Sequence, residues 1–247
     1  MAALQPTPRS PPAIRYAQLP CPGCPGRHMN VCQPLDDELQ VDFFDTGLRQ
    51  KWARRQQLFR SGDPAGPIFK VTSGIVAVSR SLPNGTRQIL RFALPGDICG
   101  YLSEGGAYAF DGEAITDVTT CTFQRDGFDN FAATHDVTAE AVRRELSQVL
   151  ASAGQHLIVL GRMPTAARVA HFLCRMKADL TSRSQTAGLV ALPMARGDIA
   201  DYLGMRLETV SRSFTKLHKL KLISVSTDAV VVLDEIGLAA IGGYPPE

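Results

Sequence analysis

The most restrictive feature of this sequence is the stretch 197–221, which has the spacing of a helix-turn-helix. A short first helix over residues 197–203 carries the small residue Ala200 where two helices must approach closely. Gly204 follows it, and glycine tolerates the positive φ of a tight turn. Six residues later, Val210 is placed to point back between the two helices. This spacing predicts two helices joined by a tight turn.

The second predicted helix, residues 207–219, has an apolar face and a polar face. The apolar face is expected in the core and consists of Leu207, Val210, Phe214 and Leu217. The stretch 206–221 holds five Lys or Arg and one Glu, and this local positive charge suits DNA phosphates. We therefore expect the helix to enter a major groove, with a DNA-facing set of Arg206, Glu208, Ser211, Arg212, Thr215 and Lys219. The alternative is a solvated amphipathic helix that has no groove to enter.

The residues after this helix favour a DNA-binding domain with a wing. Two short apolar runs, 222–225 and 229–233, are separated by the polar residues 226–228. Runs of this length on either side of a polar turn predict a β-hairpin, which we expect beside the second helix.

Two further patterns precede the helix-turn-helix. Between about residues 52 and 131, short apolar runs alternate with turns, which predicts a β-barrel or sandwich. Its expected strands include 68–71, 74–79, 87–92 and 114–123. The pattern then becomes helical, and an apolar seam recurs in steps of four and three: Leu146, Leu150, Ala153, Leu157 and Leu160. Such a seam suits pairing with a second copy of the helix, although a helix lying on its own domain is the alternative.

Composition limits the remaining function classes. No apolar run approaches the ~18 residues of a membrane span, and the Pro-rich first twenty residues lack the apolar core of a signal peptide. We therefore expect a cytoplasmic protein with no membrane partner, whose six cysteines are thiols. The net charge of +2 does not by itself indicate a nucleic-acid partner. No nucleophile–base set and no phosphate-binding loop stands out, so an enzyme is not expected.

Cys21, Cys24 and Cys32 form a second strong motif on a loop rich in Gly and Pro. Three thiolates on such a loop can converge on one centre, and they suit an iron–sulfur cluster or zinc. A fourth ligand has to come from elsewhere in the chain, and for zinc it would be His28 or Cys121. Three unligated thiols are a further alternative. Cys174, inside a predicted helix, is expected to be a small buried apolar residue, with an exposed redox thiol as its alternative.

The order of β-barrel, long helix and winged helix-turn-helix, with the runs Arg196-Gly197-Asp198-Ile199-Ala200-Asp201-Tyr202-Leu203-Gly204 and Glu208-Thr209-Val210-Ser211-Arg212, resembles the CRP/FNR family of transcription regulators. The Glu-x-x-Ser-Arg pattern is similar to the FNR branch, and the resemblance covers about residues 21–240. It implies a homodimer on a palindromic DNA operator, with Glu208, Ser211 and Arg212 reading bases. It also implies activation through RNA polymerase, contacted near residues 82–86.

The resemblance implies an α+β fold in five parts. We expect a disordered tail over residues 1–20, a cysteine-rich loop over 21–34, a β-roll like those that bind cyclic nucleotides over 35–137, a dimerisation helix over 138–163, and a winged helix-turn-helix domain over 164–247. Members that bind cyclic AMP hold its phosphate with an Arg-(Ser/Thr)-Ala run. The stretch 100–120 contains no arginine, which argues against cyclic AMP.

FNR-type oxygen sensors hold a [4Fe-4S] cluster with an N-terminal cysteine trio and one barrel cysteine. The resemblance therefore implies a cluster on Cys21, Cys24, Cys32 and Cys121, with Cys99 as the competitor for the fourth place. The spacing here, two residues and then seven, is longer than the family's best-known two and then five. The expected function is oxygen- or redox-responsive regulation. The alternatives are a regulator of this fold without a cluster, which responds to zinc, a thiol or another ligand or works constitutively, and an iron–sulfur enzyme or electron carrier.

Overall fold

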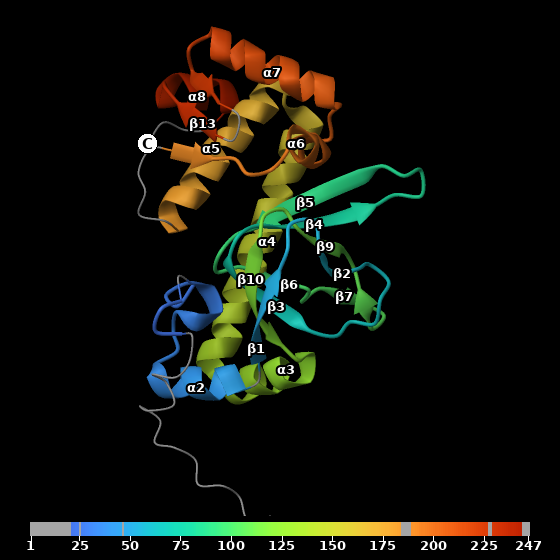
Figure 1. Ribbon diagram of the computed structural model, residues 1–247, viewed down its shortest axis with the longest axis vertical. Coiled ribbons are helices and arrows are strands. Elements are labelled where there is room, and N and C mark those ends of the chain that lie inside the picture. The colour runs from blue at the N-terminus through green and yellow to red at the C-terminus, as the bar shows by residue number, and fades with distance from the viewer. Residues whose placement is uncertain (1–20, 25, 46, 184–188, 227–228, 244–247) are drawn as a thin grey trace, which may run out of the picture.

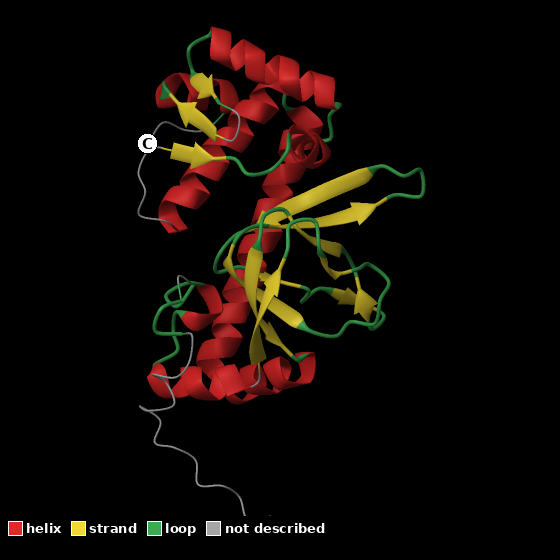
Figure 2. Ribbon diagram, in the orientation of Figure 1, coloured by secondary structure: helices red, strands yellow, loops and turns green. Residues whose placement is uncertain are grey.

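The protein is described by a computed structural model over residues 21–24, 26–45, 47–183, 189–226 and 229–243 (Figure 1). The predicted disordered tail, residues 1–20, lies outside the described residues. The chain forms a β-roll, a long helix and a helical domain with a small sheet, in that order (Figure 2). This confirms the predicted architecture. None of the helices in the described ranges combines the length and the hydropathy needed to cross a membrane.

The β-roll consists of two four-stranded sheets with an apolar core between them. One sheet has the order β1 (Gly47–Trp52), β10 (Val118–Phe123), β3 (Ile68–Ser73) and β6 (Ile98–Cys99). The other has the order β2 (Gln57–Phe59), β9 (Asp111–Ala114), β4 (Val76–Ser81) and β5 (Arg87–Ala93). A small hairpin joins β7 (Ser103–Glu104) to β8 (Ala107–Tyr108). Phe59, Phe69 and Val76 are among the buried residues between the sheets.

The prediction of one strand over residues 114–123 was wrong. The chain leaves β9 at Ala114, turns, and enters β10 at Val118 in the opposite sheet. The hydroxyl of Thr116 accepts a hydrogen bond from the backbone N–H of Ile75 at 3.0 Å, which holds the turn against the neighbouring chain. The turn is short and lies between two runs of β-forming residues, with the half-buried Thr116 and the exposed Asp117 as its only polar residues. The sequence prediction therefore joined the two strands into one.

Helices flank the roll and continue into the C-terminal domain. The N-terminal segment contributes the 3-10 helix η1 (Asn30–Cys32) and α2 (Asp37–Asp45). After the roll come α3 (Arg125–Thr134), the long α4 (Asp136–Arg162) and α5 (Thr165–Arg183). The C-terminal domain adds β11 (Leu189–Ala191), α6 (Arg196–Leu203), α7 (Leu207–Lys219), β12 (Ile223–Val225), β13 (Ala229–Val232) and α8 (Glu235–Gly242). The predicted hairpin is present, and β11 extends it to a three-stranded sheet that was not predicted.

The helix-turn-helix is formed by α6 and α7. Gly204 adopts the left-handed conformation that its position requires, with φ 59°. Ala200 and Val210 are buried between the helices. Phe214 and Leu217 are buried as predicted, but Leu207 is 48% exposed, so its assignment to the core was wrong. Leu207 is the first residue of α7, and the buried face of the helix begins only one turn later, at Val210.

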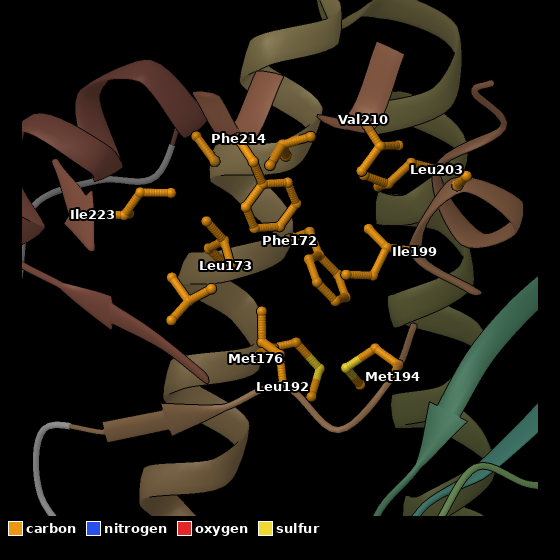
Figure 3. Close-up of a cluster of buried hydrophobic side chains, with 14 of the residues drawn as sticks. Phe172, Leu173, Met176, Leu192, Met194, Ile199, Leu203, Val210, Phe214 and Ile223 are labelled. Carbon is orange, nitrogen blue, oxygen red and sulfur yellow. The ribbon is translucent and has the colours of Figure 1, made fainter. Parts of the chain in front are cut away.

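One apolar core spans the roll and the DNA-binding domain. Phe172, Ile199 and Phe214 lie in it with other side chains of α5, α6 and α7 (Figure 3). Residues from the roll, including Ile89 and Leu94, belong to the same buried cluster. The two predicted domains are therefore packed together in this structure, which sequence patterns alone did not predict.

An ionic network reinforces this domain contact. Arg87, at the start of β5, donates to Asp201 at 2.8 Å and also to Asp198, which is only 2% exposed. Arg55 donates to Asp198 and to Glu113. Burial alone would raise the pKa of Asp198, but the hydrogen bonds from Arg55 and Arg87 outweigh it and lower the pKa. Two roll arginines thus hold the first helix of the helix-turn-helix against the roll.

Candidate cysteine site and DNA-binding surface

Four cysteines surround one cavity of about 270 Å³ between the N-terminal loop and the roll. Cys21, Cys24 and Cys32 are half-buried on the loop, and Cys121 reaches the cavity from β10. Cys99 is buried on β6 among the roll's core residues and lines a different cavity. The structure thus brings the predicted trio together with Cys121 and keeps Cys99 apart from it.

Backbone hydrogen bonds fold the cysteine loop into consecutive turns. The N–H of Cys24 donates to the carbonyl of Cys21 at 3.1 Å, and that of Cys32 donates to Met29 at 3.2 Å. The side chain of Asn30 donates to the carbonyl of Gly96 at 3.1 Å, which attaches the loop to the roll. Asn30 has a positive φ of 49°, a conformation that Asn tolerates better than most residues. These turns direct the loop cysteines toward the roll without a regular helix.

Polar groups that the sequence did not single out complete the site. Lys70 on β3, which pairs with β10 at Cys121, is 1% exposed and lines the cavity. Gln40 of α2 donates to the carbonyl of Cys32 at 3.4 Å, while its Oε1 is buried without a hydrogen-bond partner. Arg27 donates to the same carbonyl and pairs with Asp37. The sequence signal for this group was the position of Lys70 between the apolar residues Phe69 and Val71.

The pKa values of two thiols of this site, Cys21 and Cys121, are raised. Burial, together with the neighbouring Cys32 and Cys24, raises the pKa of Cys21 to about 11, against the opposing charge of Lys70. Burial and the same neighbours raise the pKa of Cys121 to about 12. Thiolates are the form that binds metal, so binding here must release protons and strengthen as the pH rises.

The donor set fits a cluster better than a single ion. In the described part of the chain, no three His, Cys, Asp or Glu side chains converge closely enough to hold one metal ion. A tetrahedral zinc needs four donors within about 2.3 Å of one point. The four thiols here are instead distributed around a cavity, and His28 is exposed and absent from its lining. Four soft thiol donors around a shared space fit a multinuclear iron–sulfur centre.

The cysteine loop packs against the long helix. η1 contacts α4, and Val31, next to Cys32, is completely buried. Val142 and Leu146 of α4 belong to the same apolar cluster as Val31, Cys32 and Cys121. The loop therefore packs directly against the helix that carries the predicted dimer seam.

The predicted seam is largely solvent-exposed in the single chain. Leu150 and Leu157 are 74% and 70% exposed, and Ala153 is also exposed. Leu146 and Leu160 are half-buried against their own chain. Ile158, which the sequence prediction did not include, is 53% exposed beside Leu157. Exposed leucines along one helix leave an apolar surface of the kind that a partner covers.

The six predicted DNA-facing residues are all exposed; five lie on α7 and Arg206 immediately precedes it. They are Arg206, Glu208, Ser211, Arg212, Thr215 and Lys219. α7 lies at the outer end of the domain (Figure 1). Arg212 donates to the hydroxyl of Thr209 at 3.4 Å, which holds its guanidinium near the N-terminal half of the helix, where major-groove readers contact bases. The predicted DNA-facing set does not include Arg196 of α6. Its guanidinium carbon lies 3.5 Å from the centre of the Phe214 ring.

Arg212→Ala is expected to weaken binding to a specific operator by about 5- to 150-fold, because one lost base contact of this kind costs roughly 1–3 kcal/mol. Binding to DNA of unrelated sequence should change much less. Fluorescence anisotropy on labelled operator and unrelated duplexes at one fixed salt concentration measures both. Arg60→Ala, an exposed arginine of the roll, is the control. An equal loss on both duplexes would show that Arg212 contacts only phosphates.

A second cavity, of about 40 Å³, lies between the roll and α4. Its lining includes Gly100, Arg91, Cys99 and Glu145. Arg91 is a cation outside the arginine-free stretch 100–120, but it donates to the carbonyl of Ile98 and faces Asp97 at 4.0 Å. A cavity of this size holds a few water molecules.

Glu145 of α4 makes this region sensitive to pH. Burial raises the pKa of Glu145 to about 7, helped by the charge of Asp97 and opposed by the hydrogen bond from Ile98 N–H and by Arg91 and Lys70. The folded protein therefore keeps this proton up to about pH 7, whereas an unfolded chain releases it near pH 4.5. The free energy of unfolding should therefore fall by about 3 kcal/mol as the pH rises through this window.

Glu145→Gln should remove this pH dependence and be the more stable protein at pH 8, because glutamine carries no charge to bury. Urea unfolding of both proteins at pH 5 and pH 8 provides the test. Glu140→Gln, an exposed position on the same helix, should leave the wild-type profile unchanged. Parallel pH profiles for wild type and Glu145→Gln would contradict the assignment.

Comparison with known proteins agrees with this arrangement. Residues 167–241 match the Crp-like helix-turn-helix domain, and residues 49–135 match the cyclic nucleotide-binding domain. The transcriptional activatory protein AadR of Rhodopseudomonas palustris is 33% identical over 229 residues, which cover 90% of this chain and 95% of AadR. The nitrogen fixation regulation protein FixK of Bradyrhizobium diazoefficiens is 33% identical over 221 residues, covering 90% and 93% of the two chains.

The solved structures agree with the sequence relatives. The structure of FixK2 from Bradyrhizobium japonicum is similar with a TM-score of 0.73 and 30% identity, over 81% of this chain and 98% of FixK2. The transcriptional activator protein anr of Pseudomonas aeruginosa is 30% identical over 86% of this chain and 89% of its own length. These relatives are transcription regulators rather than enzymes, and the helix-turn-helix indicates DNA as a binding partner. The chain therefore belongs to the CRP/FNR family of transcription regulators.

Proposed function

We propose that this protein is an oxygen- or redox-responsive regulator that uses a [4Fe-4S] cluster held by Cys21, Cys24, Cys32 and Cys121. The observation that supports it is the convergence of these four thiols on one cavity. When bound, such a cluster would supply an oxygen-labile link between the loop and the roll. Similarity to FnrL of Cereibacter sphaeroides, a transcriptional activator 28% identical over 91% of this chain, supports the regulator part of this proposal.

The chain's own residues then transmit the state of the site. Val31 belongs to one apolar cluster with Val142 of α4, and an iron–sulfur cluster held by the four cysteines would fix the loop on β10 in this position. This contact supports the conformation of α4 in which Leu150 and Leu157 face a second copy across a two-fold axis. The dimer presents two α7 helices to a palindromic operator, with half-sites about one helical turn apart. Two half-sites bound together give an affinity far above that of one.

The dimer also has an exposed surface for transcription activation. The tip of the β4–β5 hairpin, residues 82–86, projects from the roll with Leu82 47% exposed (Figure 1). The backbone N–H of Leu82 donates to the carbonyl of Thr86 at 2.8 Å, and the N–H of Gly85 donates to the carbonyl of Leu82 at 2.9 Å, which keeps this tip in a defined shape. We propose it as the surface that contacts RNA polymerase.

The decisive experiment compares the protein prepared with and without oxygen. Anaerobically reconstituted protein should be brown, carry about four iron and four sulfide per chain, and bind a palindromic operator. Air should bleach the colour and weaken operator binding together. A colourless protein after careful reconstitution, or one with a single zinc, would overturn the cluster proposal and leave a cluster-free regulator of the same family.

A further inference from the structure

A buried lysine lies within the cysteine site. Lys70 is 1% exposed, although lysine is almost never fully buried without a partner. It occupies the middle of β3 and is paired in register with Cys121 on β10. On the strand beyond, Arg49 of β1 is paired with Cys121 from the other side. The cysteine ligand is therefore flanked by a basic residue on each neighbouring strand.

The ammonium group of Lys70 is directed to the loop cysteines. Its Nζ donates a hydrogen bond of 2.6 Å to the carbonyl of Gly26, two residues after Cys24. A Cβ atom added to Gly26 would lie 3.3 Å from Lys70 Nζ and 3.8 Å from Cys24 Sγ. The nitrogen and the sulfur thus both lie beside Gly26, where a side chain would contact each of them.

Among the described residues, no carboxylate lines this cavity to balance the positive charge of Lys70. The described residues that line the cavity include Lys70, Arg27 and Arg49 but no Asp or Glu. Glu145, whose charge Lys70 influences, lines the other cavity and binds Ile98 N–H. A buried cation without an anion is costly, so this environment favours an anionic occupant. Four thiolates on an iron–sulfur cluster give a site with net negative charge.

We propose that Lys70 is the internal counter-cation of the cysteine site, setting the reduction potential of the bound cluster and tying the loop to β3 through Gly26. This inference rests on the proposed function. A positive charge beside the cluster stabilises its more negative, reduced form. Removing that charge should therefore favour the oxidised form by at least about tenfold, equivalent to about 59 mV toward a more negative potential for one electron.

Three substitutions of Lys70 and one control variant separate the effect of the Lys70 charge from that of its hydrogen bond to Gly26. Lys70→Met removes both, Lys70→Gln keeps a donor for Gly26 without the charge, and Lys70→Arg keeps the charge. Lys51→Met, at an exposed lysine on β1, is the matched control. The measurements are the one-electron midpoint potential of the reconstituted cluster, the iron and sulfide content, and thermal unfolding of each apo-protein. If Lys70→Met does not fold, the Gln and Arg variants still separate the two roles.

The expected result is a more negative potential in Lys70→Met and Lys70→Gln, with Lys70→Arg near wild type and Lys51→Met unchanged. A wild-type potential in Lys70→Gln, or an equal shift in Lys51→Met, would overturn the counter-cation role while leaving the cluster proposal intact. Wild-type protein that takes up no cluster would overturn both. The iron and sulfide content of the wild type thus distinguishes the two failures.

Discussion

Cys121→Ser is expected to leave the anaerobically reconstituted protein without its cluster and to weaken operator binding by about 10²- to 10⁴-fold. The serine hydroxyl is a poor ligand for iron compared with a thiolate. Cys121 is the one proposed ligand on the roll, so its loss removes the link through the cluster between the loop and β10. The hydrogen bonds of Asn30 to Gly96 and of Lys70 to Gly26 then remain as the polar contacts named above. If loop attachment supports the dimer, the loss removes the affinity gained from binding two half-sites at once.

Cys99→Ser is the control, because Cys99 is a buried roll residue of the same type that lines the other cavity. It should retain the visible spectrum and the operator affinity of the wild type, with at most a modest loss of stability. Iron and sulfide analysis and anaerobic anisotropy measure both variants. Loss of the cluster in Cys99→Ser together with its retention in Cys121→Ser would reverse the assignment of the fourth ligand.

Leu157→Glu is expected to convert the protein to a monomer and to reduce operator affinity by a similar factor of about 10²–10⁴. Two carboxylates would face each other across the two-fold axis in place of an apolar contact, and burying them there is unfavourable. Because Leu157 is 70% exposed in the single chain, the fold itself should tolerate the change. The unfolding free energy of the monomer should stay within about 0.5 kcal/mol of wild type.

Val137→Glu, at an exposed position near the start of the same helix, should remain dimeric. Light scattering after anaerobic size-exclusion chromatography gives the mass of each variant. A Leu157→Glu protein that keeps its cluster but is a monomer would show that the cluster binds without dimerisation and that dimerisation needs the α4 seam. A Leu157→Glu dimer would show that α4 does not form the interface.

The sequence alone predicted the features that depend on local patterns. Ala200, Gly204 and Val210 predicted the helix-turn-helix because each meets a steric requirement of the turn within a few residues of chain. The alternation of short apolar runs and turns predicted the roll, and the trio of cysteines predicted a loop site. Each of these signals is contained in a short stretch, where backbone conformation and side-chain spacing are directly linked.

Only the tertiary structure decided which distant groups meet. No short pattern places Cys121 at the loop site and Cys99 away from it, because both lie on strands that flank β3 in one sheet. Cys121 is paired with Lys70 and Cys99 with Phe69, and successive residues of a strand point to opposite faces of the sheet. Lys70 was overlooked because a lysine in a strand is usually exposed, and its burial depends on the loop that folds over it. The packing of α6 against the roll through Arg55 and Arg87 is equally non-local. Contacts between residues far apart in the chain depend on how whole elements pack, which no short pattern encodes.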